Sequence, residues 1–160
     1  MILDTEGLAK NVIKMLIDKK LTISTAESCT GGGIGAALTA VPGSSSVYKG
    51  GVVSYCNEIK HRVLGVSEEL LATKGAVSLE VAEVMAAGVR ALFKTDVAVS
   101  VTGVAGPGGD EFGNCVGTVF IGYADKNLVI ARHFLFDGDR EAVRRQAIAA
   151  ALQLILEINE

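Results

Sequence analysis

The chain has 160 residues, of which 49% are hydrophobic and only 5% aromatic, and its formal net charge is −3. This aliphatic composition excludes a disordered chain, and the length predicts a single domain over residues 1–160. The acidic balance, without any long basic run, argues against a nucleic-acid partner. No apolar run is long enough for a membrane helix, and the first residues are acidic rather than basic. We therefore expect a cytoplasmic protein with no membrane partner.

The cysteine and histidine content bears on metals and disulfides. The cysteines, Cys29, Cys56 and Cys115, stand at irregular spacing without a C-x-x-C pair, and the chain has only 2 histidines. A disulfide framework or a zinc site needs a more regular pattern. The sequence therefore predicts no metal and no cofactor.

In the first half of the chain, hydrophobic periodicity predicts alternating helices and strands. Asp4 or Thr5 is expected to cap the first helix, and Asn57 a short central one. Ser78 is expected to open a long helix with Leu92 on its buried face. The predicted elements, in chain order, are a helix at 8–17, a strand at 21–26, a helix at 34–39, a strand at 51–55, and helices at 57–64, 68–73 and 78–92.

The second half predicts three strands and one helix. Residues 97–102 form a near-continuous apolar run, which is typical of a strand buried on both faces. The runs at 116–124 and 128–136 flank a short polar turn and predict a hairpin. Asp139 is expected to cap the last helix. Together the elements predict an α/β fold, a single three-layer α/β/α domain with a mixed, mostly parallel sheet and one antiparallel hairpin.

Two glycine-rich loops, at 27–33 and 103–109, each follow a predicted strand. In an open α/β sheet such loops gather at the carboxyl ends of the strands, where ligands bind. The first loop leads into a helix, whose free N–H groups and dipole favour an anion. The alternative is that these glycines only allow a helix to pack closely on the sheet. The spacing matches neither G-x-G-x-x-G nor the P-loop pattern, so a dinucleotide or triphosphate site is poorly supported.

Candidate reacting groups lie in and after the first loop. Ser28 and Cys29 are possible nucleophiles, although a serine at a helix start is more often a cap and a cysteine there a small buried side chain. Lys60 falls in the first turn of a predicted helix, where the dipole opposes its positive charge and lowers its pKa. A lysine of lowered pKa is able to act as a general base for a hydroxyl, whereas the alternative is an exposed surface lysine.

Arginines open the last predicted helix. Arg140 and Arg144 are four residues apart and share a helix face, so a bound phosphate or carboxylate would explain them. The competing interpretation is an exposed helix start in which these arginines pair with neighbouring acidic residues.

Seven motifs in the same order along the chain resemble the CinA C-terminal domain family. They are Thr25–Gly32, Gly43-Ser44-Ser45, Tyr55-x-Asn57-x-x-Lys60, Gly75–Ser78, Thr102–Pro107, Val116–Val119 and Gly138–Arg144. Characterised members of the family are nicotinamide-nucleotide amidases, which convert nicotinamide mononucleotide and water into nicotinate mononucleotide and ammonia. The resemblance implies that Ser28 is the nucleophile, Lys60 its base and Tyr55 an assisting group, on a three-layer α/β/α fold.

The resemblance also implies a small nucleotide as the partner and a set of substrate-binding residues. Backbone amides of the 30–32 turn are expected to hold the tetrahedral oxyanion. The 5′-phosphate is expected at Arg140, Arg144, the Ser44-Ser45 loop or the 102–106 loop, without a ranking among them. The full expected set is Glu27, Thr30, Gly31, Gly32, Ser44, Ser45, Asn57, Thr102, Gly103, Ala105, Gly106, Arg140 and Arg144.

Two other functions remain open at this point. A serine amidase for another small carboxamide would carry the same loops. A non-catalytic interaction domain, linked to competence and recombination, would not need a serine, tyrosine and lysine in this combination. The alanine-rich helices at 78–92 and 147–158 predict a homo-oligomer, with a dimer as the expected form.

Overall fold

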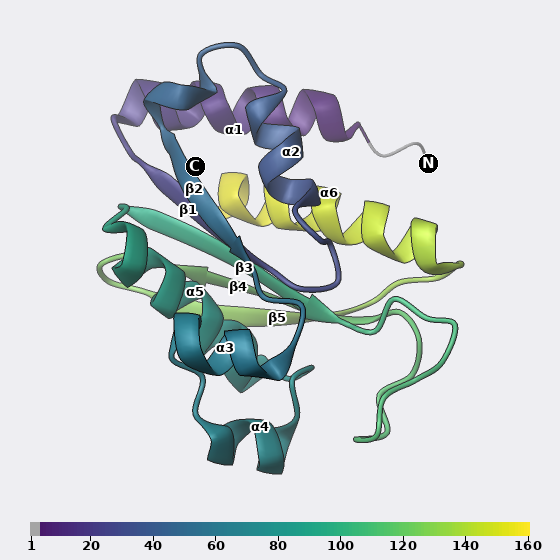
Figure 1. The fold of residues 1–160 in the computed structure, drawn as a ribbon. Coiled ribbons are helices and arrows are strands. Elements are labelled where there is room, and N and C mark those ends of the chain that lie inside the picture. Colours follow the sequence, from purple (N-terminus) through teal and green to yellow (C-terminus); the bar gives the residue numbers. More distant parts are fainter. Residues whose placement is uncertain (1–3) are drawn as a thin grey trace.

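The computed structural model describes residues 4–160, and its centre is one five-stranded sheet in the order β2-β1-β3-β4-β5 (Figure 1). The strands are β1 (Ile23–Glu27), β2 (Tyr48–Val53), β3 (Val97–Gly103), β4 (Thr118–Ala124) and β5 (Val129–Leu135). Strand β1 pairs in parallel with β2 and β3, whereas β4 pairs antiparallel with β3 and β5. The mixed sheet and the hairpin are thus confirmed, but only the β2-β1-β3 half is paired in parallel.

Helices cover both faces of this sheet. They are α1 (Thr5–Lys19), α2 (Gly33–Thr39), α3 (Asn57–Leu64), α4 (Glu68–Lys74), α5 (Leu79–Phe93) and α6 (Arg140–Asn159). Figure 1 shows α1, α2 and α6 on one side of the sheet and α3, α4 and α5 on the other. The predicted three-layer architecture is therefore confirmed.

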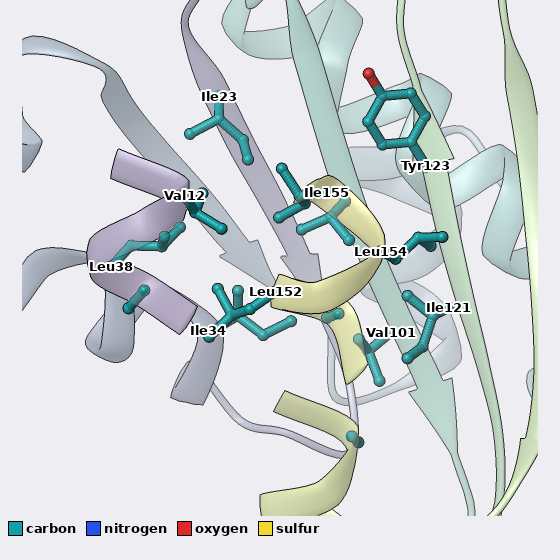
Figure 2. Close-up of a cluster of buried hydrophobic side chains, with 14 of the residues drawn as sticks. Val12, Ile23, Ile34, Leu38, Val101, Ile121, Tyr123, Leu152, Leu154 and Ile155 are labelled. Carbon is teal, nitrogen blue, oxygen red and sulfur yellow. The ribbon is translucent and has the colours of Figure 1, made fainter. Parts of the chain in front are cut away.

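The larger core lies between the sheet and the α1–α2–α6 layer (Figure 2). Ile34 and Leu38 from α2 share this core with Leu152 and Ile155 from α6, Ile34 lying beside Leu152, and all four are fully buried. Burial of one such side chain stabilises the fold by roughly 1.5–3 kcal/mol. The alanine-rich stripe of α6 also packs against α1 within the chain, so it is not the free surface for a second copy that its sequence predicts.

Three local expectations need correction. Strand β2 begins at Tyr48 rather than 51 and ends at Val53, because its pairing with β1 starts at the Ile23–Tyr48 register. The N-cap of α3 is Cys56 and not Asn57, which is the first helical residue. Leu92 is 52% exposed, since the buried face of α5 is turned toward Val89 instead.

The parallel half of the sheet decides where the loops meet. Strands β1, β2 and β3 run in the same direction, and Glu27 pairs with Val53 on one side and Val101 on the other. The residues that follow these strands therefore emerge together at the carboxyl ends of the strands, where open α/β folds bind ligands. Across residues 4–160, no helix combines the length and apolar character needed to cross a bilayer.

Candidate active site

A cavity of about 320 Å³ opens at the carboxyl ends of β1, β2 and β3. Its walls come from the segment after β1, the link between β2 and α3, the loop after β3, and the start of α6. Nine of the residues expected at the site line it: Ser28, Tyr55, Asn57, Lys60, Thr102, Gly103, Ala105, Gly106 and Arg140. The tertiary structure thus brings both glycine-rich segments, Tyr55 and Lys60 to one place.

Ser28 and Lys60 are in direct contact inside this cavity. Lys60 Nζ donates a hydrogen bond of 3.0 Å to Ser28 Oγ and one of 2.7 Å to the carbonyl oxygen of Ser54. Ser54 is itself fixed, because its backbone N–H donates to the carbonyl oxygen of Glu27 at 2.7 Å. The α2 helix begins only at Gly33, so Ser28 is not the cap of that helix.

Burial lowers the pKa of Lys60, whose side chain is 2% exposed. Desolvation penalises the ammonium form, and the nearby thiols of Cys56 and Cys29 oppose this effect. The direction agrees with the expectation from the sequence, but the main cause is burial rather than the helix dipole. A buried amine whose pKa is lowered, next to a serine hydroxyl, is suited to general-base chemistry.

Cys29 is a poorer nucleophile than Ser28 in this setting. Burial raises the pKa of the Cys29 thiol to about 11, although its own backbone amide and the charges of Arg144 and Lys60 partly offset this. A thiol reacts as its thiolate, which is scarce at neutral pH under these conditions. Cys29 packs in the main hydrophobic core, and Lys60 donates to Ser28 rather than to its thiol.

The N-terminus of α2 already holds an anion, the carboxylate of Glu27. Its Oε1 accepts from Thr30 Oγ1 at 2.7 Å and from the Ile34 amide at 2.8 Å, and its Oε2 accepts from the Gly35 amide at 3.0 Å. The helix-start amides of Ile34 and Gly35, which were expected to favour a bound anion, are therefore occupied. Glu27 is 2% exposed and, like Thr30, does not line the cavity.

The glycines of the 30–32 turn shape the backbone and also lie outside the cavity lining. Gly31 and Gly32 adopt φ values of +59° and +101°, which side chains rarely tolerate. The Gly31 amide donates to the Ser28 carbonyl oxygen at 3.0 Å. The Cys29 amide, by contrast, donates to no other residue among the hydrogen bonds of residues 4–160, and Cys29 lines the cavity.

The two arginines of α6 that were expected to bind phosphate differ in their contacts. Arg144 donates from Nε to the Cys29 carbonyl oxygen at 3.0 Å and from Nη2 to the Thr30 carbonyl oxygen at 3.3 Å. It ties the segment after β1 to α6 and lies outside the cavity. Arg140 lines the cavity and donates to Gly106 O at 2.6 Å and to Tyr55 Oη at 2.7 Å.

Ser44 and Ser45 lie at the other end of the parallel strands, near their amino-terminal ends. They belong to a short 3-10 helix, Ser44–Ser46, that precedes β2. Since β2 runs parallel to β1, this helix is beside the start of β1, whereas Ser28 follows its end. Five residues of strand, roughly 17 Å, separate the two ends. Within this chain these serines do not meet the reacting groups.

Two residues of the site had no signal in the sequence. Ser54 contributes a backbone carbonyl, which no residue pattern reveals. Asp110 lines the cavity, and its carboxylate accepts from the amides of Phe112 and Asn114 at 3.0 and 2.8 Å, which orders the loop after β3. Within residues 4–160, no group of three or more His, Cys, Asp or Glu side chains is arranged to hold a metal ion.

Comparison with known proteins finds one family model and several similar sequences. The family described as the CinA C-terminal domain matches residues 5–158. A Pseudomonas putida protein named nicotinamide-nucleotide amidohydrolase PncC is 50% identical over 137 residues, 86% of each chain. A CinA-like protein of Endomicrobium trichonymphae is 47% identical over 152 residues, which are 95% of this chain but 36% of that protein. The chain thus spans just over a third of the length of several curated relatives.

Solved structures give the same result for the fold. A competence-damaged protein (CinA) superfamily protein from Klebsiella pneumoniae has a TM-score of 0.95 at 36% identity, with 98% of each chain covered. A competence/damage-inducible protein from Agrobacterium tumefaciens has a TM-score of 0.94 at 40% identity, covering 98% of this chain and 96% of that one. The chain belongs to the CinA C-terminal domain family.

Proposed function

We propose that this chain is an amidohydrolase that converts nicotinamide mononucleotide and water into nicotinate mononucleotide and ammonia, a step of pyridine-nucleotide recycling. The observation that carries the proposal is the buried hydrogen bond of 3.0 Å between Lys60 Nζ and Ser28 Oγ. The Pseudomonas putida relative named as a nicotinamide-nucleotide amidohydrolase supports the choice of substrate.

The first step is attack by Ser28 on the carboxamide carbon. Neutral Lys60 has one lone pair, and its contact with the Ser54 carbonyl oxygen uses an N–H, which leaves the lone pair available to Ser28. Lys60 takes the Ser28 proton as Oγ bonds to the carbon, and the carboxamide oxygen becomes the oxyanion. Activation of a hydroxyl by an adjacent base is the usual route to a serine nucleophile.

The Cys29 amide is the donor that we assign to this oxyanion. It belongs to the residue directly after the nucleophile, a position that serves the same purpose in other serine hydrolases. The 30–32 turn is less suitable, because its residues lie outside the cavity lining and the Gly31 amide already donates to Ser28 O. Removal of one such donor typically costs about 2.7–4 kcal/mol of transition-state stabilisation.

The intermediate then collapses with loss of ammonia. Protonated Lys60 gives its proton to the departing nitrogen, and an ester of Ser28 with the nicotinoyl group remains. Water attacks this ester with neutral Lys60 again as base, and the acid leaves as Ser28 recovers its hydrogen. Tyr55, which lines the same cavity, assists as a hydrogen-bond donor.

Arg140 is the cation that we assign to the 5′-phosphate. It lines the cavity, and no ion pair among residues 4–160 includes it. Guanidinium carries five N–H donors, and two contacts leave donors free for an anion. Arg144 is less suitable, since its guanidinium is directed to the carbonyl groups of the segment after β1.

The direct test is ammonia release from nicotinamide mononucleotide by the purified protein without added metal. We expect turnover by the wild type and none by Ser28→Ala. A panel of nicotinamide, nicotinamide riboside, asparagine and glutamine tests the substrate. Ammonia from one of these but not from the nucleotide would place another carboxamide in the cavity. Absence of turnover with every substrate would contradict an enzymatic function.

A further inference from the structure

Tyr55 and Arg140 meet at the cavity although 85 residues separate them in the sequence. Arg140 Nη2 donates to Tyr55 Oη at 2.7 Å, and Arg140 Nη1 donates to the Gly106 carbonyl oxygen at 2.6 Å. Tyr55 lies on the link between β2 and α3, Gly106 in the loop after β3, and Arg140 at the start of α6. One guanidinium therefore joins three walls of the cavity.

We propose that Arg140 is a positioning residue for Tyr55, which it holds over the cavity with the phenol hydrogen directed to the substrate carboxamide. The inference rests on the proposed function and adds to the phosphate contact assigned to Arg140 there. No bond forms or breaks at Tyr55 in this role, because the phenol only donates a hydrogen bond.

The direction of the Tyr55–Arg140 hydrogen bond follows from chemistry. An arginine side chain has donors only and keeps its charge in proteins, so Tyr55 Oη must be the acceptor in this contact. The hydroxyl hydrogen of Tyr55 then remains free. Since Tyr55 lines the same cavity as Ser28 and Lys60, a carboxamide bound there shares the cavity with this free donor.

Tyr55 needs such an anchor because it is otherwise poorly held. Tyr55 is 61% exposed, and it lies between β2 and α3 without belonging to either. Arg140 is the only hydrogen-bond partner of its hydroxyl among residues 4–160. An exposed side chain has several rotamers, and restricting it to one costs conformational entropy. If the rotamer is fixed before the substrate binds, the reaction does not bear this cost.

Arg140 itself is firmly placed. Asp139 caps α6 by accepting from the Ala142 amide at 2.9 Å, and Gly138 turns the chain with a φ of +107°. A cation at the first position of a helix opposes the dipole, so helix stability gives no reason for an arginine here. Its contacts to Tyr55 and Gly106 give one. Its other N–H donors stay available for the phosphate, and the two roles are compatible.

The test is a double-mutant cycle in kcat with nicotinamide mononucleotide as substrate. The variants are Arg140→Ala, Tyr55→Phe and the pair, with Arg145→Ala as the control because Arg145 lies in the second turn of the same helix and its ion pair with Glu141 is long, at 3.8 Å. We expect Arg140→Ala and Tyr55→Phe each to lower kcat at least ~10-fold, and the pair to be no slower than Tyr55→Phe alone, as for residues that act as a unit. Arg145→Ala should match the wild type.

Arg140→Lys separates position from charge. Lysine keeps the positive charge for the phosphate but lacks the planar fork that reaches two oxygens at once. We expect its KM to lie nearer to the wild-type value than that of Arg140→Ala, while its kcat stays low. Wild-type kcat with a raised KM in Arg140→Ala would overturn the inference, as would losses that multiply in the double variant.

A readout without catalysis keeps this inference separate from the proposed function. In protein with ¹³C-labelled tyrosine, the order parameter of the Tyr55 ring should fall in Arg140→Ala and stay unchanged in Arg145→Ala. An order parameter of the Tyr55 ring that is unchanged in both variants would overturn the positioning role. A wild-type protein that releases no ammonia from the nucleotide would instead overturn the proposed function, whatever the ring does.

Discussion

Ser28 Oγ and Lys60 Nζ lie 3.0 Å apart, although 32 residues separate them along the chain. The backbone of Ser54 holds this pair in place, since it donates to Glu27 O at 2.7 Å and accepts from Lys60 Nζ at 2.7 Å. Glu27, which precedes Ser28, and Lys60 are thus both bound to Ser54, the residue that follows β2. The parallel register of β1 and β2, which pairs Glu27 with Val53, brings Ser54 to this position.

The nucleophile is tested by two substitutions at neighbouring positions. Ser28→Ala should lower kcat at least ~10³-fold, a typical loss when a covalent catalyst is removed. Cys29→Ala should keep most of the activity, because the buried Cys29 thiol has a raised pKa of about 11. The measurement is ammonia release by both purified variants. Inactivation by a thiol-alkylating reagent that spares Cys29→Ala would assign the reaction to the cysteine.

The pH dependence of kcat/KM reports on Lys60. The pKa of a free lysine is ~10.4. Because burial lowers the pKa of Lys60, its neutral form is present at a lower pH than that of a free lysine. Activity should therefore rise with pH along a limb set by one group of apparent pKa below that value. Lys60→Arg keeps the charge but is not deprotonated, so it should be nearly as inactive as Lys60→Ala. A Lys60→Arg enzyme with a tenth or more of wild-type activity would make Lys60 an electrostatic clamp instead of a base.

The same lysine should make the stability of the fold depend on pH. The pKa of Lys60 is lower in the folded chain than in the unfolded one, so the unfolded state binds more protons between the two values. The free energy of unfolding should therefore rise with pH across that window. Urea unfolding of the wild type and of Lys60→Met at several pH values checks this, since only the wild type carries the contribution. Parallel pH profiles for the two proteins would contradict a lowered pKa.

Arg144 should act on the segment after β1 rather than on the phosphate. Its contacts to the carbonyl oxygens of Cys29 and Thr30 are hydrogen bonds from a charged donor, each worth about 1.5–3 kcal/mol in favourable cases. Arg144→Ala should lower the free energy of unfolding by ~1–3 kcal/mol and lower kcat/KM equally for the nucleotide and for nicotinamide riboside. Arg145→Ala is the matched control. A loss confined to the phosphorylated substrate would show that Arg144 binds the phosphate.

Glu27 should be essential for the start of α2. Its carboxylate accepts from Thr30, Ile34 and Gly35 in a site that is nearly closed to water. Glu27→Gln keeps one acceptor oxygen but directs an NH₂ group at a buried amide donor, at a cost of about 1–3 kcal/mol. Urea unfolding measures the loss, with the exposed Glu6→Gln in the first turn of α1 as the control. Unchanged stability in Glu27→Gln would mean that the carboxylate is not needed to fix the loop.

Much of the fold follows from local sequence. Asp4, Ser78 and Asp139 cap their helices as predicted, because a cap joins a side chain to an amide only three residues on. The hairpin of β4 and β5 is local as well. Where a local pattern failed, at Asn57 and Leu92, the contacts of the folded chain had decided which residue is the cap and which side of the helix is buried.

The candidate site divides in the same way. The sequence by itself pointed to the residues that we propose for the chemistry, since a serine in a glycine-rich turn and a lysine five residues after a tyrosine are properties of short segments. Only the tertiary structure decided that Glu27 fills the anion site of α2, that Arg144 binds backbone carbonyls, and that Ser44 lies at the other end of the parallel strands. These outcomes depend on strand order and on hydrogen bonds between distant segments. Neither is encoded in the spacing of residues along the chain, because partners far apart in sequence are selected only when the whole sheet assembles.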